Sequence, residues 1–185
     1  MEAPAVTRHR RPFFAPLWLI LLVAALFGLV ALALYHEAVT TVLIVVRPAE
    51  REPGTIADPP ISPEGEAQAQ RLARIFGDVG VASGSLDAIY ISDDRRAQQT
   101  AAPLADRLHR APVTFNIEDA GSIARSARRD HAGGAVLLIA GGPAYQKVLA
   151  SLGVSAAELR GDDADVAYVA SVPTFGRSRL VRLRF

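Results

Sequence analysis

Three loops of this sequence contain residues that could form a binding or catalytic site. Each loop directly follows a short apolar run, and the residues concerned are Arg47 and Glu50 after 41–46, Asp93, Asp94 and Arg96 after 86–91, and Gly141 and Gly142 after 135–140. Guanidinium groups hold phosphate or carboxylate groups through paired hydrogen bonds. Anion binding is therefore the chemistry that the arginines offer, and the elements that position these loops decide whether they meet.

Composition excludes several other kinds of site. The chain has 185 residues and no cysteine, which excludes disulfides, thiolate nucleophiles and cysteine-ligated zinc. Twenty basic residues face nineteen acidic ones, for a net charge of +1. Since no strong field points to nucleic acid or to an acidic partner, we expect no nucleic-acid partner, and nothing indicates a metal or a cofactor.

The apolar runs are typical of strands in the interior of a sheet. Residues 41–46 (TVLIVV) are short, mostly β-branched and continuously apolar, which favours a central parallel strand. Similar runs predict strands at 86–91, 113–117 and 135–140. Two alternating runs at 166–172 and 178–185 are typical of a hairpin.

Helix signals lie between these runs. Ser62 is a candidate N-cap ahead of Pro63, and Asp93 or Asp94 can cap a second helix that contains Pro103. Weaker helical patterns surround Ile123 and Tyr145. Strands that alternate with helices predict an α/β fold: a mostly parallel sheet with helices on both faces and a C-terminal hairpin. In such sheets ligands bind beyond the carboxyl ends of strands, where the three loops lie.

The N-terminal region differs from the rest. Residues 13–35 contain no charge, and at 1.5 Å per residue a helix of this length reaches roughly 34 Å, enough for a bilayer core of about 30 Å. Basic residues precede it, so the positive-inside rule predicts a short cytoplasmic tail (1–12), a transmembrane signal anchor (13–35) and a domain (40–185) on the periplasmic side of the inner membrane. A cleaved signal peptide is the alternative, although its apolar region is usually about 7–15 residues.

Four segments, taken in order, resemble the histidine phosphatase (phosphoglycerate mutase-like) superfamily in its short bacterial form. They are residues 40–47 (TTVLIVVR), 58–65 (DPPISPEG), 91–101 (ISDDRRAQQTA) and the C-terminal tail. The resemblance covers residues 40–185 and implies the family's α/β fold. It also implies that Arg96, and Arg47 at the end of the first strand, are phosphate-binding candidates, with Glu50 nearby.

The resemblance fails at both histidines on which the family's reaction depends. The family's nucleophilic histidine would stand where this chain has Pro48, and its second histidine where this chain has Gly142. A nucleophile needs a lone pair and a phosphoryl transition state needs charged donors, and neither residue supplies them. None of the four histidines (His9, His36, His109 and His131) is placed to substitute.

These observations predict a membrane-anchored, catalytically inactive histidine-phosphatase-like domain. It would bind a phosphate-bearing or anionic ligand through Arg47 and Arg96, or else a protein partner that the sequence does not identify. Arginines kept only as structural residues, paired with Glu50, Asp93 or Asp94, are an equal alternative for this site. A residual phosphatase that uses the arginines and a non-histidine base such as Glu50 is the alternative function.

Overall fold

The computed structural model describes residues 17–38, 40–54, 57–78, 85–153, 166–172 and 179–184. The chain divides into two compact units, residues 1–35 and residues 36–185. The first unit contributes most of helix α1 (Leu17–Ala38), and the second contains all the strands and the other helices. Each unit is considered by itself.

Helix α1 is apolar on all its faces. Its 22 residues read LWLILLVAALFGLVALALYHEA, and its described side chains, at 18–33 and Tyr35, are all exposed. Within the described residues, no helix combines the length and the apolarity needed to cross a membrane. The predicted helix is therefore present from Leu17 onward, but its transmembrane assignment has no support from the structure.

The domain contains one mixed six-stranded sheet with the order β3-β2-β4-β1-β5-β6. Strands β1 to β4 run parallel to one another, whereas β5 pairs antiparallel with both β1 and β6. The strands are β1 (Thr41–Val46), β2 (Ala88–Ser92), β3 (Val113–Phe115), β4 (Ala135–Ile139), β5 (Val166–Val172) and β6 (Arg179–Arg184). The C-terminal hairpin is confirmed, and the expected parallel pairing holds for β1 to β4, but β5 and β6 make the sheet mixed.

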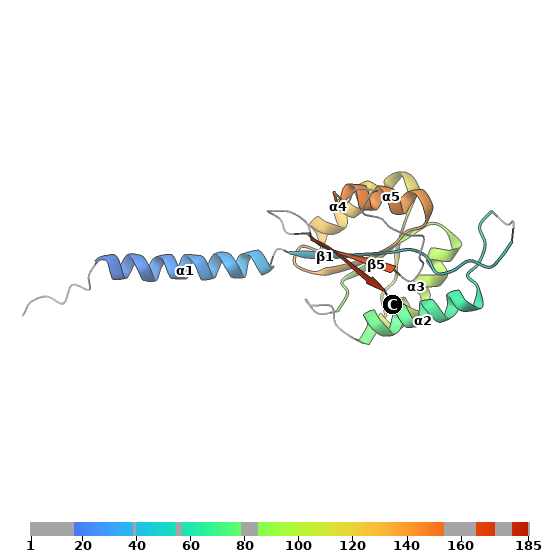
Figure 1. Ribbon diagram of the computed structural model, residues 1–185, viewed down its shortest axis with the longest axis horizontal. Helices are drawn as coiled ribbons and strands as arrows, with labels where there is room; N and C mark the ends of the chain where they lie inside the picture. The colour runs from blue at the N-terminus through green and yellow to red at the C-terminus, as the bar shows by residue number, and fades with distance from the viewer. Residues whose placement is uncertain are drawn as a thin grey trace, which may run out of the picture. The chain divides into compact units, whose positions relative to one another are not determined.

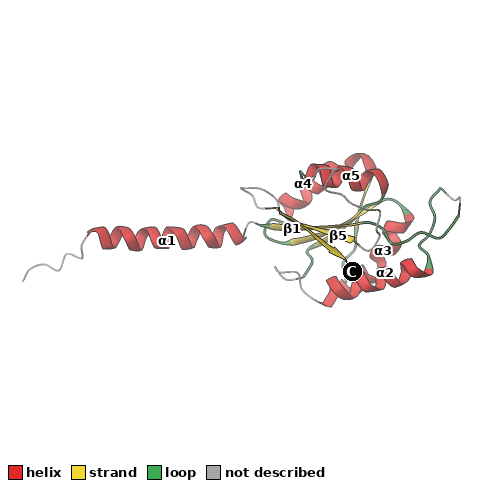
Figure 2. Cartoon of the chain, in the orientation of Figure 1, coloured by secondary structure: helices red, strands yellow, loops and turns green. Residues whose placement is uncertain are grey.

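Helices cover both faces of the sheet (Figures 1 and 2). They are α2 (Pro63–Asp78) and α3 (Arg95–Leu108) on one face, and α4 (Ala120–Asp130) and α5 (Gly142–Ser151) on the other. On the first face Leu72, Phe76 and Leu104 pack against side chains of the central strands. On the second face Ala124, Tyr145 and Leu149 do so. The side chains of β1 and β4 alternate between the two clusters, which explains why these strands are apolar throughout.

The third predicted strand is shorter than expected. Strand β3 ends at Phe115, and a 3₁₀ turn (Ile117–Asp119) leads directly into α4. Val113 and Thr114 are exposed, since β3 is an edge strand. The pattern at 113–117 predicts a strand that runs past Phe115 because Ile117 continues the apolar alternation, but Ile117 is itself exposed.

Sheet register aligns the ends of the strands that precede the three loops. Val46 at the end of β1 pairs with Ile139 at the end of β4, and Ile91 of β2 pairs with the same Ile139. The backbone N–H of Ala140 donates to the carbonyl of Val46 over 3.1 Å. The loops after β1, β2 and β4 therefore leave the sheet at one edge and at one level.

Candidate functional site

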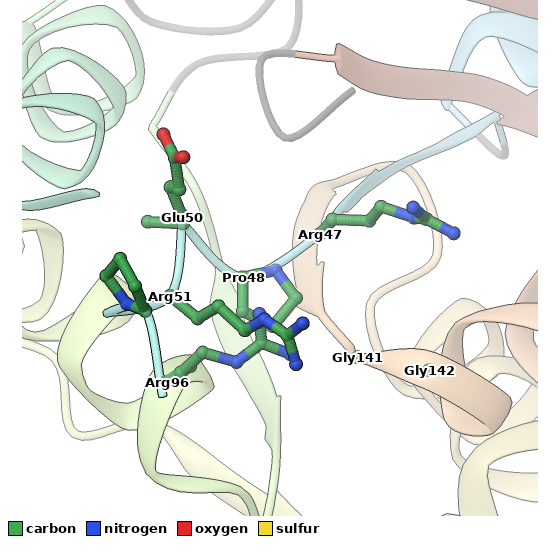
Figure 3. Close-up of a pocket in the computed structure, with 9 residues that line it drawn as sticks. Arg47, Pro48, Glu50, Arg51, Arg96, Gly141 and Gly142 are labelled. Carbon is green, nitrogen blue, oxygen red and sulfur yellow. The ribbon is translucent and has the colours of Figure 1, made fainter. Parts of the chain in front are cut away.

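A pocket of about 650 Å³ lies beyond the carboxyl ends of β1 and β4. Figure 3 shows the residues that line it. They are Arg47, Pro48, Ala49, Glu50, Arg51 and Pro53 from the loop after β1, Arg96 from the first turn of α3, and Gly141 and Gly142 at the start of α5. All five residues that the sequence indicated for this site, Arg47, Pro48, Glu50, Arg96 and Gly142, contribute to its walls.

Side chains of α2 and α3 hold the loop after β1 in place. Thr100 accepts a hydrogen bond from the buried N–H of Ala49 over 2.9 Å and donates to the carbonyl of Arg96 over 2.7 Å. Gln68 of α2 accepts from the N–H of Glu50 over 2.8 Å. Because a buried N–H without a partner costs free energy, the loop has little freedom to take another path.

The far end of the same loop is fastened to α3 as well. Gln99 accepts from the N–H of Ile61 over 2.9 Å, and the carboxylate of Asp58 accepts from the N–H of Arg95 over 3.1 Å. Gly65 permits the loop to lie against α2, because a Cβ at this position would stand 2.4 Å from the carbonyl oxygen of Glu50. The loop that supplies six lining residues is therefore set by the helices on one face of the sheet.

The loops after β2 and β4 are joined beside the pocket. Ser92 donates to the carboxylate of Asp94, and the N–H of Gly141 donates to the Ser92 hydroxyl over 3.3 Å. Asp94 also accepts from the N–H of Ala97 over 2.9 Å and so forms the N-cap of α3, as predicted for Asp93 or Asp94. This carboxylate is engaged in structure rather than in the pocket.

Arg47 does not point toward Arg96. Its guanidinium carbon lies 4.9 Å from the centroid of the Tyr145 ring, which is the geometry of a cation–π contact. In Figure 3 the Arg47 side chain points away from Pro48, whereas the Arg96 side chain ends below it. Arg47 and Arg96 therefore do not converge as the sequence led us to expect.

Tyr145 is well placed to hold that arginine. The residue is buried in α5, and its ring meets the ring of Tyr168 edge to face, with centroids 6.4 Å apart. Burial, and secondarily Tyr168, raise the pKa of the Tyr145 hydroxyl far above its usual value, while Arg47 opposes the rise. The hydroxyl therefore stays protonated at ordinary pH.

Arg51 is a lining residue that sequence reasoning missed. It forms an isolated antiparallel bridge with Ile61, and its side chain runs toward the same place as that of Arg96, below Pro48 in Figure 3. The signal was present, because Arg51 lies in a loop that follows a predicted strand. The family resemblance indicates Arg47 and Arg96 but not Arg51.

Pro48 and Gly142, at the two positions where the resemblance would require histidine, both fit their surroundings. Pro48 is buried, with its ring beside Gly141. Gly142 has φ +46°, and a Cβ there would meet nothing within 4 Å. His109 ends α3, and His131 lies before β4 with its ring 3.3 Å from the Tyr90 hydroxyl. Neither histidine lines the pocket, whereas His9 and the side chain of His36 lie outside what the structure describes.

The described lining thus offers cations but no imidazole. Three guanidinium groups can bind an anion, and Glu50 is the one carboxylate among the lining residues. In Figure 3 the Glu50 carboxylate points away from Pro48 and from the guanidinium groups of Arg51 and Arg96. These lining residues can therefore hold an anionic group.

Comparison with known proteins agrees with the resemblance found in the sequence. Residues 46–119 match the histidine phosphatase superfamily (branch 1). A mycobacterial glucosyl-3-phosphoglycerate phosphatase is similar in structure, with a TM-score of 0.62, 18% identity, and coverage of 76% of this chain and 97% of that one. The protein histidine phosphatase SixA, solved with tungstate, gives a TM-score of 0.60 at 13% identity over 77% and 96% of the two chains. No curated protein sequence gives a significant match.

Proposed function

We propose that this protein is a histidine-phosphatase-like domain that has lost phosphoryl transfer and binds an anionic, phosphate-bearing ligand at the former catalytic pocket. The segment matched to the histidine phosphatase superfamily and the phosphoglycerate mutase-like fold are the premises of this proposal. The observation that carries it is the composition of the pocket. Pro48 and Gly142 stand among three lining arginines.

The chemistry of those two residues supports the loss of activity. A phosphohistidine reaction needs an imidazole nitrogen that attacks phosphorus and a charged donor that stabilises the departing oxygens. A proline nitrogen within a peptide bond has neither a free lone pair nor an N–H, and glycine has no side chain. Guanidinium groups bind anions through charge-assisted hydrogen bonds without taking part in covalent chemistry, so anion binding survives the loss of the reaction.

The direct test is an assay of the full chain, purified in detergent, on p-nitrophenyl phosphate and on phosphohistidine peptides. We expect no turnover above the buffer rate with either substrate. Turnover that disappears in the Arg96→Ala variant would contradict the proposal, because it would show that the pocket still performs catalysis. Turnover unchanged in that variant would instead indicate a contaminating enzyme.

A residual phosphatase is the competing function. Positioning and electrostatic stabilisation alone retain some catalysis, and Glu50 would then have to activate a water molecule. The direction of its carboxylate, away from Arg51 and Arg96 in Figure 3, argues against this role. A Glu50→Gln variant that abolished a measurable rate would favour the phosphatase over the binding domain.

The proposal includes attachment to a lipid bilayer through residues 13–35, with the basic tail in the cytoplasm and the domain on the periplasmic side of the inner membrane. It rests on the uncharged sequence and on the exposure of apolar side chains around α1. Phe27 is 78% exposed, Leu21 69% and Trp18 63%. Burial of side chains of this size in an apolar environment is energetically favourable.

Fractionation of cells that express the full chain tests this attachment. We expect the protein in the membrane fraction after a high-salt wash, and we expect added protease to reach the domain only from the periplasmic side. Recovery in the soluble fraction, at the full chain mass, would contradict attachment. Recovery in the soluble fraction of a product shortened near Ala33 would support the signal-peptide alternative.

A further inference from the structure

We infer that the anion-binding pair of this pocket is Arg51 with Arg96, not Arg47 with Arg96, and that it takes the dianionic head of a phosphate monoester. This inference rests on the proposed function and specifies which residues perform it. It differs from the expectation drawn from the sequence, in which Arg47 was one of the two candidates.

Backbone contacts fix the origins of both side chains. Arg51 belongs to the bridge with Ile61, next to Glu50, whose N–H is held by Gln68. Arg96 lies in the first turn of α3, and its carbonyl accepts from Thr100. Both side chains line the pocket, and they run toward the same place in Figure 3. With their backbones held in place, the two side chains can reach one ligand from two sides.

Carboxylates near the pair are engaged elsewhere. Asp94 accepts from Ala97 and Ser92, and Asp58 accepts from the N–H of Arg95. Glu50 points away from both guanidinium groups. Among the described residues, no carboxylate is paired with Arg51 or Arg96, and both of these like-charged side chains line one pocket. An anion from solution would offset their repulsion.

Arg47 is committed to another contact. Its guanidinium lies over the Tyr145 ring, which burial and the Tyr168 ring hold in place. To reach the anion, Arg47 would have to give up that cation–π contact and pass the buried Pro48. Arg51 needs no such movement.

The geometry of the pair favours a phosphate monoester over a carboxylate. Each guanidinium presents a planar fork of donors, and two forks match the three terminal oxygens and double charge of a monoester head better than the two oxygens of one carboxylate. The pocket, at about 650 Å³, has room for the group that carries the phosphate. Since no lining residue donates a proton to the bridging oxygen, the ester would leave unchanged.

Isothermal titration of the full chain in detergent with phenyl phosphate tests the pair. We expect Arg51→Ala and Arg96→Ala each to weaken binding by about tenfold or more, as loss of a charge-assisted contact does. Arg47→Ala should change it by less than about threefold. Arg51→Lys, which keeps the charge and loses the fork, should fall between. Arg95→Ala is the matched control, since Arg95 is exposed beside Arg96 and does not line the pocket.

The outcomes separate the inference from the proposed function. Binding lost in Arg47→Ala and Arg96→Ala but kept in Arg51→Ala would overturn the inference and leave anion binding intact. Equal binding of phenyl phosphate and benzoate would overturn the ligand class. No binding by the parent chain would overturn anion binding itself. Circular dichroism of each variant, matching the parent, shows that a loss reflects the site and not the fold.

Discussion

The two sides of the pocket differ in what holds them together. On the side of α2 and α3, side chains of Gln68, Gln99 and Thr100 bind the backbone of the loop after β1. On the side of α5, the lining consists of Gly141 and Gly142, and Tyr145 holds Arg47 by its ring. The side of α2 and α3 positions Arg51 and Arg96 toward the pocket. On the side of α5, the ring of Tyr145 binds the guanidinium of Arg47.

This contrast shows that the scaffold of a site and its chemistry are separable. The hydrogen bonds that shape the loop involve neither Pro48 nor Gly142 as side-chain partners. The loop is therefore held in place independently of the residue types at positions 48 and 142.

Among substitutions that test the difference between the two sides, we expect the largest effect on stability at Thr100. Thr100→Val keeps the shape of the side chain but leaves the buried N–H of Ala49 without its acceptor. We expect the free energy of unfolding to fall by about 1–3 kcal/mol, with weaker anion binding because the loop loosens. Urea denaturation measures the first effect and titration with phenyl phosphate the second.

Thr114→Val is the control for this change, because Thr114 is exposed on the edge strand β3. It should alter stability by no more than about 0.5 kcal/mol. Equal effects of the two substitutions would mean that the Ala49 contact does not hold the loop.

On the side of α5, the pH dependence of stability tests the burial of the Tyr145 hydroxyl. Burial raises the pKa of its hydroxyl above the ordinary value of 10.0, so the folded protein keeps the proton longer than the unfolded chain does. The associated stability is complete below pH 10 and is lost as pH rises above it, by up to about 1.4 kcal/mol per pH unit. Denaturation curves from pH 9 to 11.5 should be flatter for Tyr145→Phe than for the parent. An unchanged slope would mean that the hydroxyl is not buried in solution.

The smallest effect is expected at Gly142, where φ is +46°. Gly142→Ala should destabilise the protein by about 1 kcal/mol, because an L-residue in the left-handed region carries a backbone penalty even in open space. Gly121→Ala is the matched control, since Gly121 lies in α4 with ordinary φ and with no atom nearer than 3.7 Å to an added Cβ. It should stabilise slightly. A higher melting temperature of Gly142→Ala would contradict the backbone penalty expected at position 142.

Much of the fold was predictable because local patterns and tertiary contacts agree. The buried runs at 41–46 and 135–140 form β1 and β4, and Asp94 caps α3 as its position suggested. The predicted site residues reach one pocket because parallel strands end at one edge. The end of β3 was not predictable from the sequence, because Ile117 is apolar yet exposed. Ile117 is exposed because it follows an edge strand, which only the tertiary structure shows.

The sequence by itself determined that two arginine-bearing loops would meet beyond the sheet, and its resemblance to the family assigns Pro48 and Gly142 to the positions of the family's histidines. Residue type and strand order suffice for both statements, because they require no side-chain direction. Only the tertiary structure decided which of the three lining arginines is held by another contact. That choice depends on Tyr145, a residue almost one hundred positions from Arg47, whose ring is brought beneath it by the packing of α5 on the sheet.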